Sequence, residues 1–460
     1  MDPTDLAYAG ASAQADLVAR GEVSPREVVQ ACLDRIERLD PQLNAFRTVY
    51  AERALIEADQ AGARAQAGER RPLLGVPVAV KDNMDVAGDV TTHGTDAYGD
   101  PAEQDSEVVR RVREAGGIPI GRTKMPELAL WPETTSPTWG VTRNPWRRDR
   151  SAGGSSGGAG AAVAAGLAGV ALGSDGGGSI RIPAACCGLF GLKTQRGRVS
   201  LMPYAEHWYG LSVIGPIART VADAALLLDA TAAEAPERPF AEAARTPPGR
   251  LRIAVSLKPP VLARVKAEAR RAVEGTADLL RGLGHDVVKR DPGHNPLLVN
   301  RLFLPRWYRG GYDDAMALPR PERLERKTRA FARLGRLTGS ARVEKARRAE
   351  AAYTERIGGL FRDHDVLLTP AMPFAPVEAG KFAGQGVVRT QLGSAQIAAF
   401  TAVWNITGQP AASVPAGFTD DGLPLAVQLI GRPDDEATLL SLAAQIEAER
   451  PWADRRPPLD

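Results

Sequence analysis

Cysteine and histidine are scarce in this 460-residue sequence. The three cysteines, Cys32, Cys186 and Cys187, are too few for a disulfide framework and lack the spacing of a Cys/His metal site. None of the five histidines lies in a motif that marks a catalytic base. We therefore expect a protein of the reducing cytoplasm with no metal centre.

A strong net charge and a long apolar run are also missing. The 58 Lys and Arg residues nearly balance the 55 Asp and Glu residues, and the net charge of +3 does not suggest a nucleic-acid partner. The longest run of small apolar residues, 159–173, is too short and too rich in glycine to span a bilayer. The N-terminus lacks the basic and apolar regions of a signal peptide. We expect neither nucleic acid nor a membrane as a partner.

Short apolar runs that end in polar or glycine-rich loops predict the strands. They lie at 76–80, 117–121, 170–174, 251–256 and 365–370. Helical patterns separate these runs along the chain. This alternation is typical of an α/β protein with a parallel or mixed central sheet flanked by helices.

Two further stretches are predicted to be helical. In the N-terminal segment, 1–70, Ser24 is placed to cap a helix that begins with Pro25, and apolar residues then recur at helical spacing. The band 301–356 is rich in arginine with interspersed glutamates, which favours solvated helices of mixed charge. A contact of this band with an acidic partner or RNA stays open as the alternative.

A band rich in glycine and serine, 151–200, contains two candidate nucleophiles. GGSSG at 153–157 matches the nucleophile-elbow pattern around Ser155, but the residues before it do not form an apolar strand. Ser179 follows a predicted strand and three glycines, whose amides are free to converge on an oxyanion. Ser179 is therefore the better candidate, with a phosphate-binding or purely structural turn as the alternative.

Lys81 is the candidate base for such a serine. It directly follows the predicted strand 76–80, at the end where α/β proteins gather their functional side chains. The alternative is an ordinary strand-end lysine that reaches solvent.

The same segments resemble the amidase signature family. The resemblance is carried by GGSSGGAGAAVAAG from Gly153 and ALGSDGGGSIRIPA ending at Ala184, with VPVAVKDN at 76–83 and further motifs in order up to GLPLAVQLIGRPDDEATLL. It covers nearly the whole chain. It implies the amidase signature fold over 1–460 as a single domain, whose parts are the helical N-terminal segment 1–70, a catalytic core at 71–230, an Arg-rich helical insertion at 301–356 and the C-terminal part of the core at 365–460.

The resemblance also implies a mechanism and its residues. Family members cleave amides with a Ser-cisSer-Lys triad, which places the nucleophile at Ser179, the bridging serine at Ser155 after a cis peptide bond, and the base at Lys81. Lys81 must then be neutral, so we expect burial to lower its pKa and activity to rise toward alkaline pH. In this mechanism the oxyanion hole comprises the amides of Gly176, Gly177 and Gly178, together with that of Ser179. The resemblance implies that Ser156, Asp175 and Arg181 support the loop.

The substrate is less closely indicated. Aromatic residues fall in segments that face substrate in the family, and five of them are candidate contacts: Trp131, Tyr204, Trp208, Trp307 and Trp404. We expect a small hydrophobic or aryl amide, or a related hydrazide, and no cofactor. The A subunit of a glutamyl-tRNA amidotransferase and a biosynthetic acyl transferase remain alternatives, and a homodimer stays open because dimers are common in the family.

Overall fold

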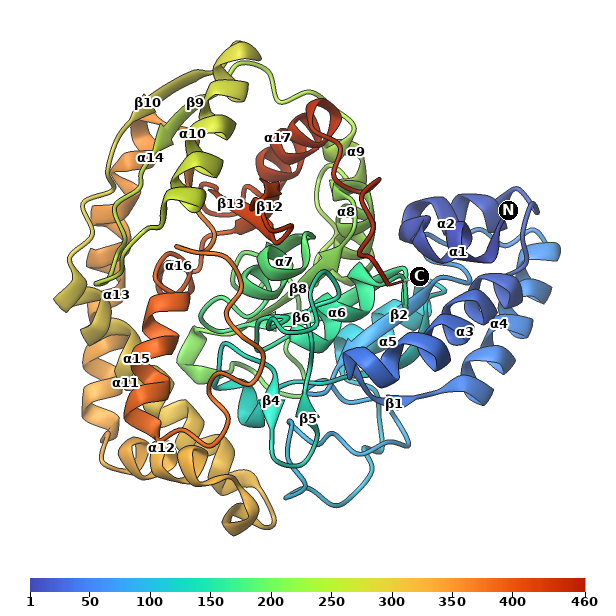
Figure 1. Ribbon diagram of the computed structural model, residues 1–460, viewed down its shortest axis with the longest axis horizontal. Helices are drawn as coiled ribbons and strands as arrows, with labels where there is room; N and C mark the ends of the chain where they lie inside the picture. Colours follow the sequence, from blue (N-terminus) through green and yellow to red (C-terminus); the bar gives the residue numbers. More distant parts are fainter. Residues whose placement is uncertain (460) are drawn as a thin grey trace.

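The computed structural model describes residues 1–459, through which a large mixed sheet runs (Figure 1). Its eleven strands are β1 (Phe46–Val49), β2 (Pro77–Lys81), β3 (Ile118–Thr123), β6 (Val170–Asp175), β7 (Phe190–Lys193), β8 (Val213–Ala218), β9 (Arg252–Val255), β10 (Asp286–Lys289), β11 (Val366–Pro370), β12 (Ala411–Phe418) and β13 (Pro424–Ile430). They lie in the order β1-β3-β2-β6-β8-β7-β12-β13-β11-β9-β10. A separate pair comprises β4 (Thr135–Ser136) and β5 (Gly140–Val141).

Parallel and antiparallel pairs share the sheet. β3, β2 and β6 are parallel, as are β11, β9 and β10 at the other end, and the strands between them are antiparallel. The five strands predicted from apolar runs are confirmed as β2, β3, β6, β9 and β11. These runs are continuously apolar because helices cover both faces of the sheet.

One face of the sheet packs against α5 (Glu107–Glu114), α8 (Val221–Thr231), α9 (Phe240–Ala244), α10 (Ala267–Gly282) and α17 (Glu436–Glu449). On β2, Val78 and Val80 belong to this core, whereas Ala79 belongs to the core on the opposite face. This is the alternation that a strand buried on both sides requires.

The opposite face carries α1 (Pro3–Tyr8), α3 (Pro25–Leu43), α4 (Ala51–Gln66), α6 (Gly157–Ala164) and α7 (Arg181–Cys187). α2 (Gly10–Ala19) contributes to both cores, with Ala11 in the first and Leu17 in the second. The predicted start of α3 is confirmed, since Ser24 and Glu27 form a capping box ahead of Pro25. Within 1–70 the helices are interrupted by β1, an edge strand of the sheet.

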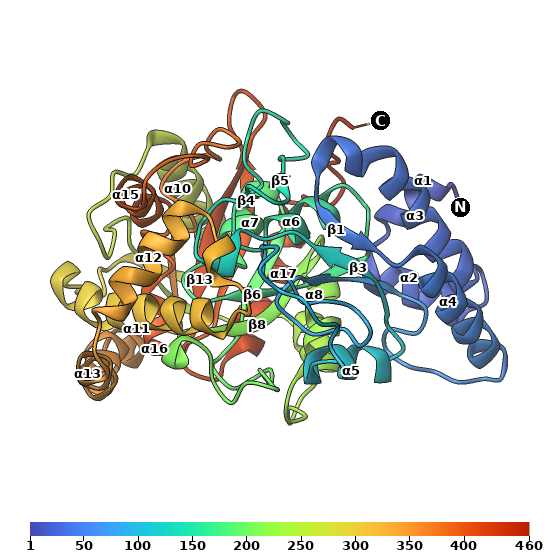
Figure 2. The same cartoon turned by 90° about the horizontal axis from the view of Figure 1, so that it is seen from below.

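A second group of helices stands at the other end of the molecule (Figure 2). It comprises α11 (Pro296–Ala317), α12 (Arg326–Arg336), α13 (Ser340–Gly358), α14 (Leu360–Asp363), α15 (Val387–Ile397) and α16 (Val403–Thr407). Short 3₁₀ turns η1 (Glu127–Ala129), η2 (Trp208–Gly210) and η3 (Pro321–Arg323) complete the described elements.

The arginine-rich band is helical, but it is not solvated throughout. Arg306 of α11 is completely buried and pairs with Glu350 of α13 at 2.5 Å. The pair joins the two helices, because a buried guanidinium needs a nearby carboxylate. None of the helices in residues 1–459 combines the length and the apolar character needed to cross a bilayer.

Candidate active site

Two neighbouring parallel strands end side by side at the candidate site. β2 and β6 pair through residues 78–80 and 170–172, so their last residues, Lys81 and Asp175, lie at the same sheet edge. Ser179 follows on the loop that leaves β6. The carboxyl ends of adjacent strands therefore bring the candidate base and the candidate nucleophile loop together.

Lys81 is held by hydroxyl groups in a site closed to solvent. Its Nζ donates hydrogen bonds to Ser155 Oγ at 2.7 Å and to Ser174 Oγ at 2.8 Å. Burial lowers the pKa of Lys81 to about 7, although the negative charge of Asp175 acts in the opposite direction. A large fraction of the amine is therefore neutral near pH 7.

Ser155 occupies a backbone site that only glycine can precede. The Gly154–Ser155 peptide bond is cis, as expected. A Cβ atom at position 154 would lie 2.6 Å from Glu133 N and 2.8 Å from Trp131 O, closer than such atoms approach in proteins. Ser155 itself is fully buried, with its hydroxyl against Lys81.

A buried ion pair supports the loop that carries Ser179. Arg181 Nε and Nη2 donate to the two carboxylate oxygens of Asp175 at 2.9 and 2.8 Å, and both side chains are excluded from solvent. Burial alone would raise the pKa of Asp175, but the charge and hydrogen bonds of Arg181 hold that pKa below its usual range. The same carboxylate accepts from Gly178 N at 2.7 Å and Ile180 N at 3.1 Å, so it fixes the loop from both sides of Ser179.

The hydrogen bond from Gly178 N to Asp175 corrects the predicted composition of the oxyanion hole. The Gly178 amide points at Asp175 and is not free to hold an oxyanion. The amides of Gly176, Gly177 and Ser179 donate no hydrogen bond within residues 1–459. These three remain as candidate oxyanion donors.

Ser156 joins the two serine-bearing segments. Its N–H donates to Ser179 O at 3.2 Å, and its hydroxyl donates to Ser174 O at 3.3 Å. The Ser179 hydroxyl makes no hydrogen bond to the part of the chain that the structure describes, and Ser179 is half-buried at a pocket wall. In that same part of the chain, no group of three or more His, Cys, Asp or Glu side chains is arranged to hold a metal ion.

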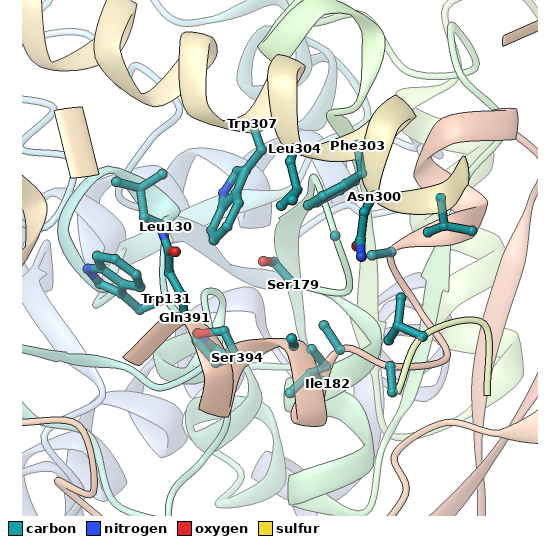
Figure 3. Close-up of a pocket in the computed structure, with 18 of the residues that line it drawn as sticks. Leu130, Trp131, Ser179, Ile182, Asn300, Phe303, Leu304, Trp307, Gln391 and Ser394 are labelled. Atoms are coloured by element: carbon teal, nitrogen blue, oxygen red, sulfur yellow. The ribbon is translucent and has the colours of Figure 1, made fainter. Parts of the chain in front are cut away.

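The pocket in front of Ser179 has a volume of about 300 Å³ and an apolar wall (Figure 3). α11 contributes Phe303, Leu304 and Trp307, and α15 contributes Gln391 and Ser394. The lining residues include no Asp, Glu, Lys, Arg or His. The pocket therefore suits an uncharged, largely apolar group.

Three of the five predicted aromatic contacts line this pocket, namely Trp131, Trp208 and Trp307. The other two, Tyr204 and Trp404, are not among the residues that line it. Tyr204 lies on a half-exposed loop outside the lining, and Trp404 is buried in the helical core, where its ring meets His294 edge-on. Val403, the residue before Trp404, faces the pocket instead.

Sequence reasoning also missed several residues of the site. Ser174 holds Lys81, and Asn405 Nδ2 donates to Asp175 Oδ1 at 2.9 Å. Both residues lie in motifs that carry the family resemblance and could have been chosen for that reason. Ser174 directly precedes Asp175, and Asn405 begins the segment NITGQP. Phe303 and Gln391 lie in ordinary helical patterns and carry no comparable signal.

Comparison with known proteins places the chain in a family. The family model described as Amidase matches residues 27–440. The relative named "Putative amidase AmiB2" from Mycobacterium tuberculosis is 54% identical over 460 residues, covering 99% of each chain. A solved 6-aminohexanoate cyclic dimer hydrolase superposes with a TM-score of 0.92 at 32% identity, covering 98% of this chain and 99% of its own. A bacterial aryl acylamidase of the amidase signature family gives 0.87 at 28% identity, covering 97% of each chain.

The fold and the site therefore define an amide hydrolase. The chain belongs to the amidase signature family, as the resemblance of its glycine- and serine-rich motifs implied.

Proposed function

We propose that this protein hydrolyses uncharged, apolar carboxamides through an acyl-enzyme on Ser179, with Ser155 as proton relay and Lys81 as base. The observation that carries the proposal is the 2.7 Å contact between Lys81 Nζ and Ser155 Oγ. The contact joins the buried Lys81 amine, whose pKa is lowered, to the Ser155 hydroxyl. The next residue, Ser156, donates a backbone hydrogen bond to Ser179 O and so links this segment to the nucleophile.

In the acylation step, Ser179 Oγ bonds to the amide carbon and gives its proton to Ser155, while the C=O π electrons move onto the oxygen, which becomes the oxyanion. The Ser155 proton passes to neutral Lys81, so the relay leaves Lys81 protonated. The step requires the hydroxyls of Ser179 and Ser155 to hydrogen-bond once substrate is bound, and catalytic contacts often tighten at that stage.

Collapse of the tetrahedral intermediate breaks the C–N bond. The proton on Lys81 returns through Ser155 to the departing nitrogen, which leaves as ammonia or an amine. Water then attacks the ester carbon and gives a proton through Ser155 to Lys81. The bond from that carbon to Ser179 Oγ breaks, the proton returns to Ser179, and the carboxylic acid leaves as the carboxylate. The amides of Gly176, Gly177 and Ser179 are the proposed donors to the oxyanion, because Gly178 is engaged by Asp175.

The pocket lining supports the substrate class. Apolar and aromatic side chains surround Ser179, and no charged residue is among them. Free glutamine, the ammonia donor of an amidotransferase, carries an ammonium and a carboxylate that this lining does not pair. We therefore favour hydrolysis of a hydrophobic or aryl amide, or of a related hydrazide, over transamidation.

The test is hydrolysis of a panel of alkyl and aryl primary amides, anilides and hydrazides at about pH 8, where Lys81 is mostly neutral. We expect wild type to turn over apolar members and to ignore glutamine. Ser179→Ala, Ser155→Ala and Lys81→Met should each lose at least about a thousandfold in kcat, as losses of triad members do. Circular dichroism checks that the variants fold. Hydroxylamine in the assay distinguishes an acyl transferase, which would form hydroxamate in preference to acid.

Activity on charged amides alone, or full activity of folded Ser179→Ala, would contradict the proposal.

A further inference from the structure

Gln391 in the pocket wall has a buried hydrogen-bond donor without a partner in residues 1–459. Gln391 of α15 lines the pocket (Figure 3). Val388 and Leu392 of the same helix also line it. Gln391 Oε1 accepts a hydrogen bond from the Tyr308 hydroxyl of α11 at 3.0 Å. Gln391 Nε2 is the buried donor.

The contact with Tyr308 fixes the direction of the amide. The oxygen and the NH₂ group share one planar carbon, so holding the oxygen also sets the position of the NH₂ group. Tyr308 lines the same pocket and comes from the opposite wall helix. α11 and α15 therefore hold the Gln391 donor in place between them.

Three other polar groups of the wall are already hydrogen-bonded, and Asn300, which also lines the pocket, is exposed to solvent. Trp131 Nε1 donates to Thr328 Oγ1 at 3.3 Å, and Trp208 Nε1 donates to Asp314 Oδ2 at 2.7 Å. The Ser394 hydroxyl donates to the carbonyl of its own helix at 2.8 Å. A buried donor without an acceptor is unfavourable, so a ligand that supplies an acceptor gains affinity at Gln391.

We propose that Gln391 is a specificity-determining residue that donates a hydrogen bond to an uncharged acceptor oxygen on the substrate. That oxygen, of a carbonyl or an ether, lies on the part of the substrate that fills the pocket, away from the amide at Ser179. The preferred substrates are apolar amides with one such acceptor. This inference rests on the proposed function, because it takes the pocket to be the substrate site.

The test uses matched primary amides. The compounds are pairs of arylalkyl amides. One member of each pair carries an acetyl group, which is a methyl ketone, and the other carries an isopropyl group of similar shape. From one pair to the next, this group lies one carbon farther from the amide. We expect wild type to prefer the ketone by about tenfold in kcat/KM at one position, as one buried hydrogen bond allows. Gln391→Met, which keeps the length of the side chain, should lose the preference. Tyr308→Phe should weaken it, and Leu392→Met, on the same helix face, should leave it unchanged.

A ketone preference that survives in Gln391→Met would overturn the inference, as would its absence at every position in wild type. Binding of the same pairs to Ser179→Ala by calorimetry measures recognition without turnover. If no amide is hydrolysed but the ketone preference in binding depends on Gln391, the proposed function fails and the binding assignment stands. If hydrolysis depends on Ser179 but shows no preference, only the inference fails.

Discussion

Lys81 Nζ lies 2.7 Å from Ser155 Oγ at the buried end of β2, and the proposed proton relay depends on this contact. Lys81 acts as a base only when neutral, and burial lowers its pKa to about 7. We predict that kcat/KM reaches a plateau above about pH 8 and falls about tenfold per pH unit well below pH 7. A pH profile with an uncharged amide, whose own ionisation does not interfere, measures this directly. A profile that keeps rising to about pH 10 would mean that the Lys81 pKa is not lowered.

The ion pair between Asp175 and Arg181 should be essential for stability. Arg181→Met leaves the Asp175 carboxylate buried without its partner, and we expect the free energy of unfolding at pH 7 to fall by about 3–5 kcal/mol. Urea denaturation measures the loss. Asp175→Asn combined with Arg181→Met should lose less than the sum of the single variants, because it also removes the unpaired charge. Strict additivity would contradict a coupled pair.

Asp314 should affect substrate binding because it holds the Trp208 ring in place. Its carboxylate accepts from Trp208 Nε1 at 2.7 Å, and a Cβ atom at Gly176 would lie 2.7 Å from the Trp208 ring. Asp314→Ala releases a ring that packs against both the pocket and the proposed oxyanion loop. We expect kcat/KM to fall about tenfold, the equivalent of one hydrogen bond, with a rise in KM that a purely global loss of folded protein would not produce.

The neighbouring acid provides the matched control. Asp313 bonds to the Tyr209 hydroxyl and to Arg309, both outside the pocket lining. Asp313→Ala should leave KM near the wild-type value. Equal effects of the two substitutions on KM would rule out a specific role for Asp314.

Substitutions of two tryptophans should distinguish a pocket residue from a core residue. Trp307 lines the pocket, whereas Trp404 is buried away from it. We predict that Trp307→Phe changes KM across a series of aryl amides and that Trp404→Phe leaves KM unchanged while lowering Tm through lost packing. Steady-state kinetics and thermal unfolding of both variants check this. A KM change in Trp404→Phe alone would reverse the assignment.

Strands and helix ends could be predicted from the sequence where residues close together in the chain determine them. Strand β6 was predictable because an apolar run ends at Asp175 and a glycine loop. The start of α3 was predictable because Ser24 and Glu27 cap it through contacts three residues apart. The cis bond before Ser155 followed from the family resemblance.

Features that depend on tertiary packing were not predictable in this way. Helical spacing alone does not tell which side of α16 faces the pocket, and Val403 lines the wall whereas Trp404 does not. The composition of the band 301–356 favours solvated helices, but Arg306 in that band is buried against Glu350, 44 positions away on another helix. The engagement of Gly178 by Asp175 depends on the shape of the loop, which the run of glycines does not specify.

The most direct test of the central claim is a search for the acyl group on Ser179. A 4-nitrophenyl ester of an apolar acid reacts at the same carbonyl and releases nitrophenolate on acylation, so a burst should accompany formation of the acyl-enzyme. We predict that acid-quenched protein carries one acyl group, on the peptide that contains Ser179, and that Ser179→Ala shows neither burst nor adduct. Hydrolysis by wild type with the adduct on another residue, or a burst that persists in Ser179→Ala, would contradict the account.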